Sequence, residues 1–339
     1  MIAMNRFLKI LVLIELAIIL FLFFKINLKR KDILGAVYIN PIKKENIVFA
    51  PTNNLKYFYE PRPNIKERDK PEWMKQEIVY TYNSDGLNER FDYPVNKPKS
   101  TFRIITLGDS HTFGFYVNTK DNWPEQLEDI LNAKLQCKNM EKIEVINLGV
   151  SGYDIQYSVE RFIRRGLKYN PDLVVWFIKD EDFSQYSEDN KKNELVLLEE
   201  LTQTNLNIDH NEIVDPIKFY EKSVNTSIKK FGLNNLFDFN YGLIKYFRKN
   251  VYQNKLIIMS YPIEDNLLII PRVKKQKEFT KKLNRELGIY FFDGILDIYT
   301  RNDLNFAPFD LHPNTKGHRA IAESLVKYLI EDKIIPCNK

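Results

Sequence analysis

The sequence predicts an α/β fold in which a central parallel sheet is covered by helices on both faces. The first observation is that apolar strands alternate with stretches of helical periodicity from Thr101 onward. The second is the unbroken apolar run PDLVVWFI (171–178), which is typical of a strand that is buried on both faces. In such a sheet, a functional site is expected at the edge where the strands end and the loops begin.

The first element is an apolar run from Phe7 to Ile26, FLKILVLIELAIILFLFFKI. Its length suits a membrane-spanning helix, which needs about 20 mostly apolar residues, and Lys9 and Lys25 can extend to the interfaces. Because no small-x-small cleavage site follows, an uncleaved anchor fits better than a removed signal peptide. A buried core helix is the alternative interpretation.

Residues 32–100 form a second region, which is rich in Pro, Asn and Tyr and has no long helical period. The pieces AVYIN, IVFAP, LKYFYEP and EIVYTYN predict short extended segments separated by turns, and NSDGL at Asn83–Leu87 is one such turn. We expect this region to connect the apolar run to a main domain, residues 101–335, and to pack on it.

The main domain is predicted to begin with the strand TFRIITL and to contain further strands in IEVINLG, PDLVVWFI, KLIIMSYP and IYFF. Helices are predicted at Trp123–Leu135, at Ser158–Leu167 and from about Thr315 through HRAIAESLVKYLI. Residues from about 184 to 254 interrupt the alternation with polar, helix-leaning sequence, so we expect an insertion there.

Composition and charge argue against one class of protein. The 50 Lys and Arg against 45 Asp and Glu give a net charge of +5, and the basic residues are scattered, which argues against a nucleic-acid-binding protein. The two cysteines, Cys137 and Cys337, are far apart and neither belongs to a CxxC pair. We therefore favour two free thiols over a disulfide.

Gly108-Asp109-Ser110 directly follows the first strand of the main domain and precedes a helix-forming stretch. A serine in that place lies at the carboxyl edge of the sheet, where converging backbone N–H groups can stabilise an oxyanion. A serine hydroxyl is a weak nucleophile unless a base accepts its proton, so the motif calls for a histidine elsewhere in the chain.

His312 is the best base among the four histidines, because Asp310 lies two residues before it in FDLHPNTKGH, ahead of the last helix. A carboxylate that close can fix the tautomer of the imidazole and stabilise the imidazolium. We predict Ser110 as the nucleophile, His312 as the base and Asp310 as the group that orients the base. Each fragment alone also fits a local turn or helix cap, and the prediction depends on their combination and order.

The other histidines are given lesser roles. His111 adjoins the nucleophile and is expected to line the site or to support its structure, and His210 is expected to be solvated in the polar insertion. A metal site of Asp310, His312 and His318 can be imagined, but no further ligand stands at a recognisable spacing. We expect neither a metal nor a cofactor.

Three segments resemble the sequence blocks of the SGNH (GDSL-type) hydrolases. GDSHTFG at Gly108–Gly114 is similar to the first block, NLGVSGYD at Asn147–Asp154 to the second, and FDLHPNTKGHRAIAE to the last. The resemblance covers about Thr101 to Leu329 and implies a flavodoxin-like, three-layer α/β/α sandwich. It also implies ester hydrolysis or, as in membrane-linked relatives, O-acyl transfer onto or off polysaccharides.

The same resemblance assigns the oxyanion hole to the backbone N–H groups of Ser110 and of Gly152, the glycine of the second block. In the family the third block usually reads Gly-x-Asn-Asp and its Asn is a further donor, whereas here KDED (179–182) follows the strand and Asp180 takes that place. An ionised carboxylate cannot donate this hydrogen bond, and losing one such donor typically costs about 10²–10³ in rate. Asp180 is therefore protonated, or replaced by another donor such as Lys179, or a cause of weak activity.

Two functions follow from these observations. The leading hypothesis is a serine-dependent esterase or O-acyltransferase that acts on acylated carbohydrate at a membrane, with an acyl-enzyme at Ser110 and with polysaccharide-biosynthesis proteins as partners. The one-residue spacing of Asp310 and His312 is also found in polysaccharide-acetylating relatives. The alternative is a membrane-tethered glycan-binding or scaffold protein with a degraded site, and Asp180 is the feature that favours it.

The side of the membrane is indicated by two conflicting signals. Arg6 and Lys9 lie at the start of the apolar run, and four basic residues lie at or after its end (Lys25, Lys29, Arg30 and Lys31), so the positive-inside rule would leave the main domain in the cytoplasm. The family resemblance favours the opposite side. We expect a single-pass membrane protein whose catalytic domain is extracytoplasmic.

Overall fold

A computed structural model of the chain describes residues 37–39, 58–179, 181–184, 228–229, 232–263, 268, 270–295 and 301–337. The apolar run Phe7–Ile26, in which we expect a membrane-spanning helix, lies outside these ranges, as do Asp180 and His210. Within the described ranges, no helix combines the length and the apolar character that a membrane crossing requires.

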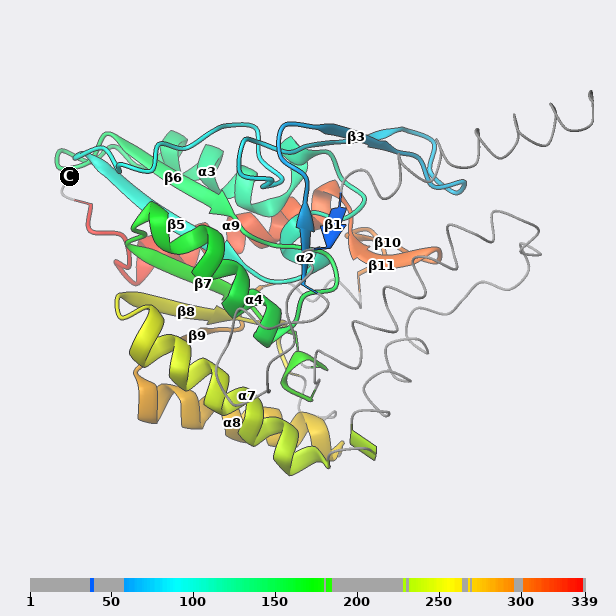
Figure 1. Cartoon of the computed structure of the whole chain (residues 1–339), viewed down its shortest axis with the longest axis vertical. Coiled ribbons are helices and arrows are strands. Elements are labelled where there is room, and N and C mark those ends of the chain that lie inside the picture. Colours follow the sequence, from blue (N-terminus) through cyan, green and yellow to red (C-terminus); the bar gives the residue numbers. More distant parts are fainter. Residues whose placement is uncertain are drawn as a thin grey trace, which may run out of the picture.

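Five strands form the central sheet of the molecule (Figure 1), in the order β6-β5-β7-β8-β9. They are Lys142–Asn147 (β6), Thr101–Leu107 (β5), Leu173–Phe177 (β7), Lys255–Met259 (β8) and Tyr290–Phe292 (β9). All neighbouring strands are parallel, and Leu107 of β5 pairs with Trp176 of β7, so the carboxyl ends of these two strands lie side by side. The predicted parallel sheet is confirmed.

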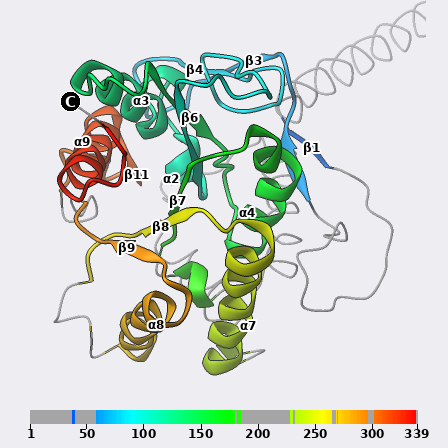
Figure 2. The same cartoon turned by 90° about the vertical axis from the view of Figure 1, so that its left-hand side faces the viewer.

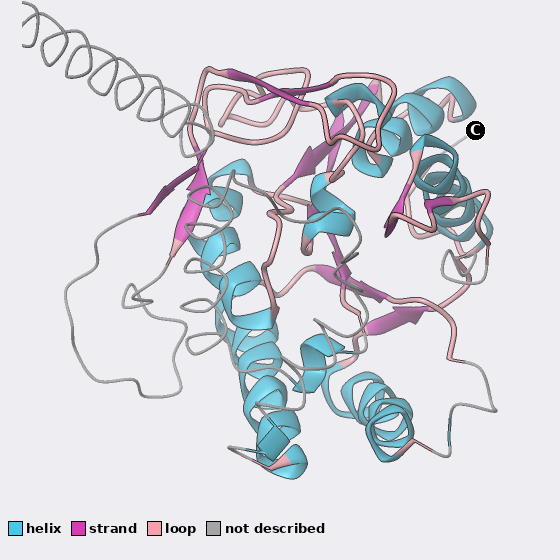
Figure 3. Cartoon of the chain, turned by 90° about the vertical axis from the view of Figure 1, so that its right-hand side faces the viewer, coloured by secondary structure: helices cyan, strands magenta, loops and turns pink. Residues whose placement is uncertain are grey.

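Helices cover both faces of this sheet (Figures 2 and 3). On one face lie α3 (Trp123–Lys134) and α9 (Thr315–Glu331), and on the other α4 (Ile155–Arg161), α7 (Leu233–Tyr246) and α8 (Pro271–Leu287). Successive residues of a strand point to opposite faces, so Val174 joins the core beneath α4, α7 and α8 while Val175 joins the core beneath α3 and α9. The predicted α/β fold with helices on both faces is confirmed.

Two of these helices differ from the sequence-based prediction. α7 falls inside residues 184–254, where we expected a polar helical insertion, yet it buries Leu236, Phe237, Leu243 and Ile244 against the sheet. These residues recur at helical spacing and most residues of the helix are apolar or aromatic, although the region around it is polar. α8 was not predicted at all, because its many lysines and arginines obscure the buried stripe that contains Phe279 and Leu283.

Residues 58–100 pack on the main domain through short strands and buried polar contacts. β2 (Tyr59–Pro61) pairs with β1 (Val37–Ile39), and β3 (Lys66–Asp69) pairs antiparallel with β4 (Ile78–Thr81). Glu60 is 2% exposed and forms ion pairs with Arg161 and Arg165, which extend from α4 and from the π turn that continues it. The charges are therefore paired where water is excluded, as buried ions require.

Three short elements lie at the end of the sheet toward which the strands point (Figure 1). They are α2 (Ser110–Phe113), which follows β5, and the antiparallel pair β10 (Asn305–Phe306) and β11 (Asp310–Pro313). This is the edge at which the sequence predicts a functional site.

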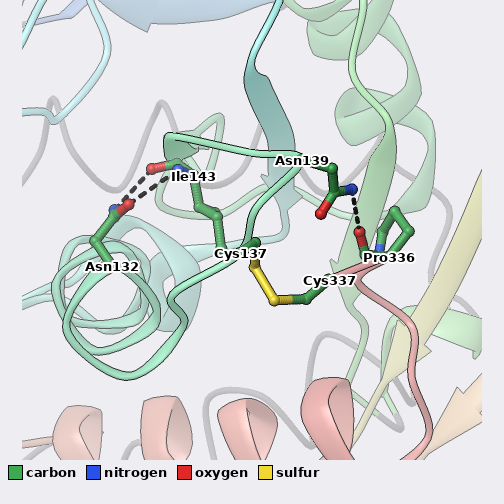
Figure 4. The surroundings of a disulfide bond; sticks show 6 residues. All are labelled: Asn132, Cys137, Asn139, Ile143, Pro336 and Cys337. Carbon is green, nitrogen blue, oxygen red and sulfur yellow. Dashed lines mark hydrogen bonds between the residues drawn. A yellow bond between two sulfur atoms is a disulfide. The ribbon is translucent and has the colours of Figure 1, made fainter. Parts of the chain in front are cut away.

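The two cysteines form a disulfide, so the expectation of free thiols was wrong. Cys137 follows α3 and Cys337 follows α9, and their Cα atoms are 5.0 Å apart although 200 residues separate them in sequence. Because α3 and α9 pack on the same face, the segments that leave them meet. Figure 4 shows the bond beside the hydrogen bond that Asn139 Nδ2 donates to the Pro336 carbonyl at 2.7 Å.

Candidate active site

Ser110 is the first residue of α2 and lies directly beyond the carboxyl end of β5. The preceding residue, Asp109, accepts a hydrogen bond from the His111 backbone N–H at 2.9 Å and so caps the short helix. Gly108 allows the sharp change of direction between strand and helix with a φ of +151°. The Ser110 side chain is thereby held at the sheet edge, in a residue that is only 3% exposed.

β11 brings a histidine and a carboxylate to this serine. His312 Nε2 lies 2.7 Å from Ser110 Oγ, and His312 Nδ1 lies 2.5 Å from Asp310 Oδ1. Burial alone would raise the pKa of Asp310, but the hydrogen bonds that it accepts from the His312 side chain and backbone hold it below the usual value, so the carboxylate is ionised at neutral pH. The three residues form one hydrogen-bonded chain that can move a proton away from the serine.

The one-residue spacing of Asp310 and His312 follows from the strand that carries them. In an extended strand, residues i and i+2 project from the same face. Asn314 fixes the end of this strand. Its side-chain oxygen accepts hydrogen bonds from the N–H groups of Lys316 and Gly317 at the start of α9, and its side-chain nitrogen donates one to the Asn305 carbonyl of β10. The strand and the helix cap therefore set the position of the imidazole.

The loop after β6 packs against the helix of the nucleophile. Asn147 Nδ2 donates to the Thr112 carbonyl at 3.0 Å, and Asn147 Oδ1 accepts the Gly149 N–H at 2.9 Å. A Cβ on Gly149 would lie 2.4 Å from the backbone nitrogen of Phe113, so only glycine fits there. Neither Asn147 nor Gly149 was singled out from the sequence, although both stand in the segment that resembles the family's second block.

Gly152, the predicted oxyanion donor of that segment, lies in the turn before α4 with a φ of +77°. This left-handed conformation costs glycine little and other residues more. The oxyanion role of Gly152 stays a prediction, as does that of Asp180, which lies outside the described residues.

A buried group of charges lies behind the nucleophile. Lys179 follows β7, is 4% exposed, and places its Nζ atom 2.7 Å from Asp109 Oδ2 and 2.8 Å from Glu181 Oε1. Burial would raise the pKa of Asp109, but the adjacent Lys179 and His111 hold it far below its usual value. Lys179, suggested by the sequence as a replacement oxyanion donor, thus forms ion pairs with two carboxylates.

The two neighbouring histidines are buried and have different surroundings. The ring of His111 lies 4.9 Å from that of His312 and meets Phe177 and Tyr261 edge to face, so it forms part of the wall of the site. Burial and the nearby Lys179 lower the pKa of His111 to about 4, which keeps its ring neutral at pH 7.

His318 has no exposed surface, and its Nδ1 atom accepts the Trp123 N–H at 3.2 Å. It is engaged in helix packing and does not join Asp310 and His312. Over the part of the chain that the structure describes, no group of His, Cys, Asp and Glu is arranged to hold a metal ion.

The family model described as GDSL-like Lipase/Acylhydrolase matches residues 104–325, a range that contains Ser110, Asp310 and His312. The search of curated proteins gave no match.

Several solved structures are similar to the chain. The psychrotrophic esterase EstA from Pseudoalteromonas sp. is 16% identical with a TM-score of 0.42, and the alignment covers 69% of this chain and 99% of that one. A putative lipolytic protein of the G-D-S-L family from Desulfitobacterium hafniense DCB-2 is 17% identical with a TM-score of 0.36, over 66% and 98% of the two chains. A two-domain esterase active on acetylated mannans is 14% identical with a TM-score of 0.39, over 71% and 52%.

Proposed function

The chain belongs to the GDSL-like lipase/acylhydrolase family and is an ester-hydrolysing enzyme, and from this premise we propose that Ser110 is its nucleophile, His312 its general base and Asp310 the carboxylate that orients the base. One observation supports the assignment above all others. A continuous hydrogen-bonded chain runs from Ser110 Oγ to His312 Nε2 at 2.7 Å and from His312 Nδ1 to Asp310 Oδ1 at 2.5 Å.

The proposed reaction begins when His312 Nε2 accepts the proton of Ser110 as Oγ attacks the acyl carbonyl. The backbone N–H groups of Ser110 and Gly152 are proposed to receive the oxyanion. Collapse of the tetrahedral intermediate expels the alcohol, which takes the proton back from His312. Water then resolves the acyl-enzyme in an esterase, and a sugar hydroxyl does so in an O-acyltransferase.

We place this reaction on acylated carbohydrate outside the cytoplasm, close to a membrane, with proteins of polysaccharide biosynthesis as partners. The apolar run Phe7–Ile26 would be the anchor. The Cys137–Cys337 disulfide supports the extracytoplasmic side, because disulfides persist in oxidising compartments and are rare in the cytosol. Alkylation of thiols in intact cells tests this placement: both cysteines should be protected until a reductant is added, and free thiols in cells would contradict it.

Hydrolysis of 4-nitrophenyl acetate tests the catalytic assignment. The purified protein should release nitrophenol, and Ser110→Ala should reduce kcat by at least about 10³-fold, since the residual rate comes from binding groups alone. Ser84→Ala, which removes an exposed hydroxyl in the turn after β4, is the matched control and should keep the wild-type rate. Undiminished hydrolysis by Ser110→Ala would remove this serine from the mechanism.

A further inference from the structure

Four aromatic side chains pack together beside the proposed catalytic histidine, and we name this group the aromatic ledge: Trp73, Tyr116, Phe306 and Phe309. The rings of Trp73 and Phe309 are nearly parallel, 8° apart in plane, with centroids 5.7 Å apart. Trp73 also meets Tyr116 at 5.1 Å and Phe306 at 5.4 Å. The ring of Tyr116 lies 5.7 Å from the imidazole of His312, so the ledge reaches the reacting groups.

The ledge comes from three distant parts of the chain. Trp73 belongs to the loop between β3 and β4, Tyr116 follows the helix of the nucleophile, and Phe306 and Phe309 belong to β10 and to the turn before β11. Residues 58–100 therefore do more than connect: they contribute a ring to the surroundings of the site.

These rings are packed but not covered. Phe309 is 51% exposed, and the other three members of the ledge are half-buried. Apolar surface that clusters on a soluble domain is often a binding site. Tyr116 also has a φ of +66°, an uncommon conformation for a residue other than glycine, held by the hydrogen bond from its N–H to the Tyr80 hydroxyl at 2.8 Å. The fold thus holds this ring beside His312 at a cost in backbone strain.

A pocket of about 280 Å³ adjoins the ledge, and Tyr116 and Phe306 form part of its lining. The rest of the lining mixes apolar with amide and charged side chains, among them Met74, Gln76, Glu77, Asn118, Asp303 and Lys316. A pyranose ring presents an apolar C–H face and a rim of hydroxyl groups, and this lining offers both kinds of partner. A fatty acyl chain would instead displace water from these amide and charged groups without offering them a hydrogen bond in return, which is costly.

We propose that the aromatic ledge and the adjoining pocket bind the carbohydrate part of the substrate. A sugar ring stacks on the exposed ring of Phe309, which is itself stacked on Trp73. Neighbouring hydroxyl groups meet the polar lining of the pocket, and the acyl ester extends past Tyr116 to Ser110. This inference depends on the proposed function, because it places the sugar relative to the same Ser110 and His312.

The test compares one ester without a sugar, 4-nitrophenyl acetate, with O-acetylated oligosaccharides of glucan, mannan, xylan and chitin. The wild type should hydrolyse at least one of the oligosaccharides. In Trp73→Ala and Phe309→Ala, kcat/KM for that oligosaccharide should fall about tenfold further than kcat/KM for 4-nitrophenyl acetate, as expected for loss of one stacked ring. Trp73→Phe, which keeps a ring, should recover part of this ratio.

The matched control is Tyr290→Ala, which removes a ring that is 45% exposed. Tyr290 lies at the amino end of the edge strand β9, whereas the site lies at the carboxyl end of β5. This substitution should leave the ratio of the two kcat/KM values unchanged. Equal losses of kcat/KM on both substrates would overturn the proposal. It would also be overturned if the variants changed only the selectivity among 4-nitrophenyl esters of different acyl length. Hydrolysis of 4-nitrophenyl acetate without hydrolysis of any oligosaccharide would also overturn it and leave the catalytic assignment intact, whereas hydrolysis of neither ester would contradict the catalytic assignment itself.

Discussion

Lys179 carries a positive charge into the buried space behind the nucleophile. Its Nζ atom lies 2.7 Å from Asp109, and both residues are at most 6% exposed. Asp109 in turn caps the helix that begins with Ser110. The ion pair therefore links β7 to the segment that presents the serine, and we regard Lys179 as a positioning residue.

Lys179→Met should lower the free energy of unfolding by about 3–5 kcal/mol, because it leaves the Asp109 carboxylate buried without its main partner. Urea unfolding measures this loss, and kcat for 4-nitrophenyl acetate should fall with it as α2 loses its fixed position. Adding Asp109→Asn to Lys179→Met removes the uncompensated charge and should return part of the stability. A single variant as stable as the wild type would show that the pair does not support the site.

His111 makes the stability of the fold depend on pH. Its pKa is about 4 in the folded chain, lowered by burial and by Lys179, against 6.5 for a free histidine. Between these values the unfolded chain binds more protons than the folded one, so stability falls as pH falls from about 6.5 and the loss levels off below about 4.

The contribution of His111 to the loss between pH 7 and pH 4.5 should be about 2–2.5 kcal/mol, since one pKa unit corresponds to about 1.4 kcal/mol and this interval covers most of the shift. Urea unfolding at pH 7 and pH 4.5 gives the loss of unfolding free energy on acidification for the wild type and for His111→Gln. The difference between these two losses is the contribution of His111. The variant should lose less stability on acidification. Equal losses in both proteins would contradict the burial of an uncharged ring at this position.

At the scale of residues, the sequence predicted what depends on local spacing. Ser110 lies in a strand–turn–helix motif, and Asp310 and His312 share a face of one strand. Two short segments of sequence were therefore enough to identify these three residues as candidates. The Lys179–Asp109 pair was not predictable in this way. It depends on β5 and β7 being neighbours, which is a property of the sheet order.

At the scale of elements, the contact between the loop after β6 and α2 decides where the nucleophile stands. Gly149 lies at this contact, and an added Cβ would meet the backbone of Phe113 at 2.4 Å and of Thr112 at 2.7 Å. Backbone atoms cannot avoid the added Cβ by changing rotamer as a flexible side chain can. Either the loop after β6 or α2 must therefore shift.

Gly149→Ala should reduce kcat for 4-nitrophenyl acetate by about 10²-fold, because displacement of a catalytic group by about 1 Å costs that much. Steady-state kinetics and thermal melting of the same preparations check it. Gly288→Ala is the matched control: this glycine ends α8 with a φ of +60° and no atom would contact its added Cβ within 4 Å, so stability should fall slightly while kcat stays at the wild-type value. Wild-type kcat in Gly149→Ala would show that α2 does not depend on this contact.

The elements that the sequence predicted are those with strong apolar patterns, namely the five strands of the sheet and the helices α3, α4 and α9. α7 was missed as a core helix because it lies in a region that is polar as a whole, and α8 because the residues outside its buried stripe are mostly polar or charged. The sequence does not reveal such a stripe unless the face that meets the sheet is known.

At the scale of the whole molecule, the disulfide closes a loop of 200 residues that includes most of the sheet. A cross-link across a loop restricts the unfolded chain and so raises the relative stability of the folded one. Cys137 precedes β6, whereas the serine follows the far end of β5, so the bond lies at the opposite edge of the sheet from the site.

Replacing both cysteines, Cys137→Ser with Cys337→Ser, should lower the free energy of unfolding by about 2–4 kcal/mol. Because the bond is remote from Ser110, kcat for 4-nitrophenyl acetate at 25 °C should not change. Urea unfolding of the double variant, and of the wild type with and without reductant, measures the effect. No difference between oxidised and reduced wild-type protein would contradict a stabilising bond.

The central claim is that a base activates Ser110, and labelling by a fluorophosphonate measures this most directly. Intact-mass spectrometry after brief exposure should show one adduct on the wild type, located at Ser110 by peptide mapping, and none on Ser110→Ala. His312→Ala should be labelled at least about 10²-fold more slowly, since its serine lacks the base. A wild-type protein that takes up no label, or takes it up equally after Ser110→Ala, would contradict the account.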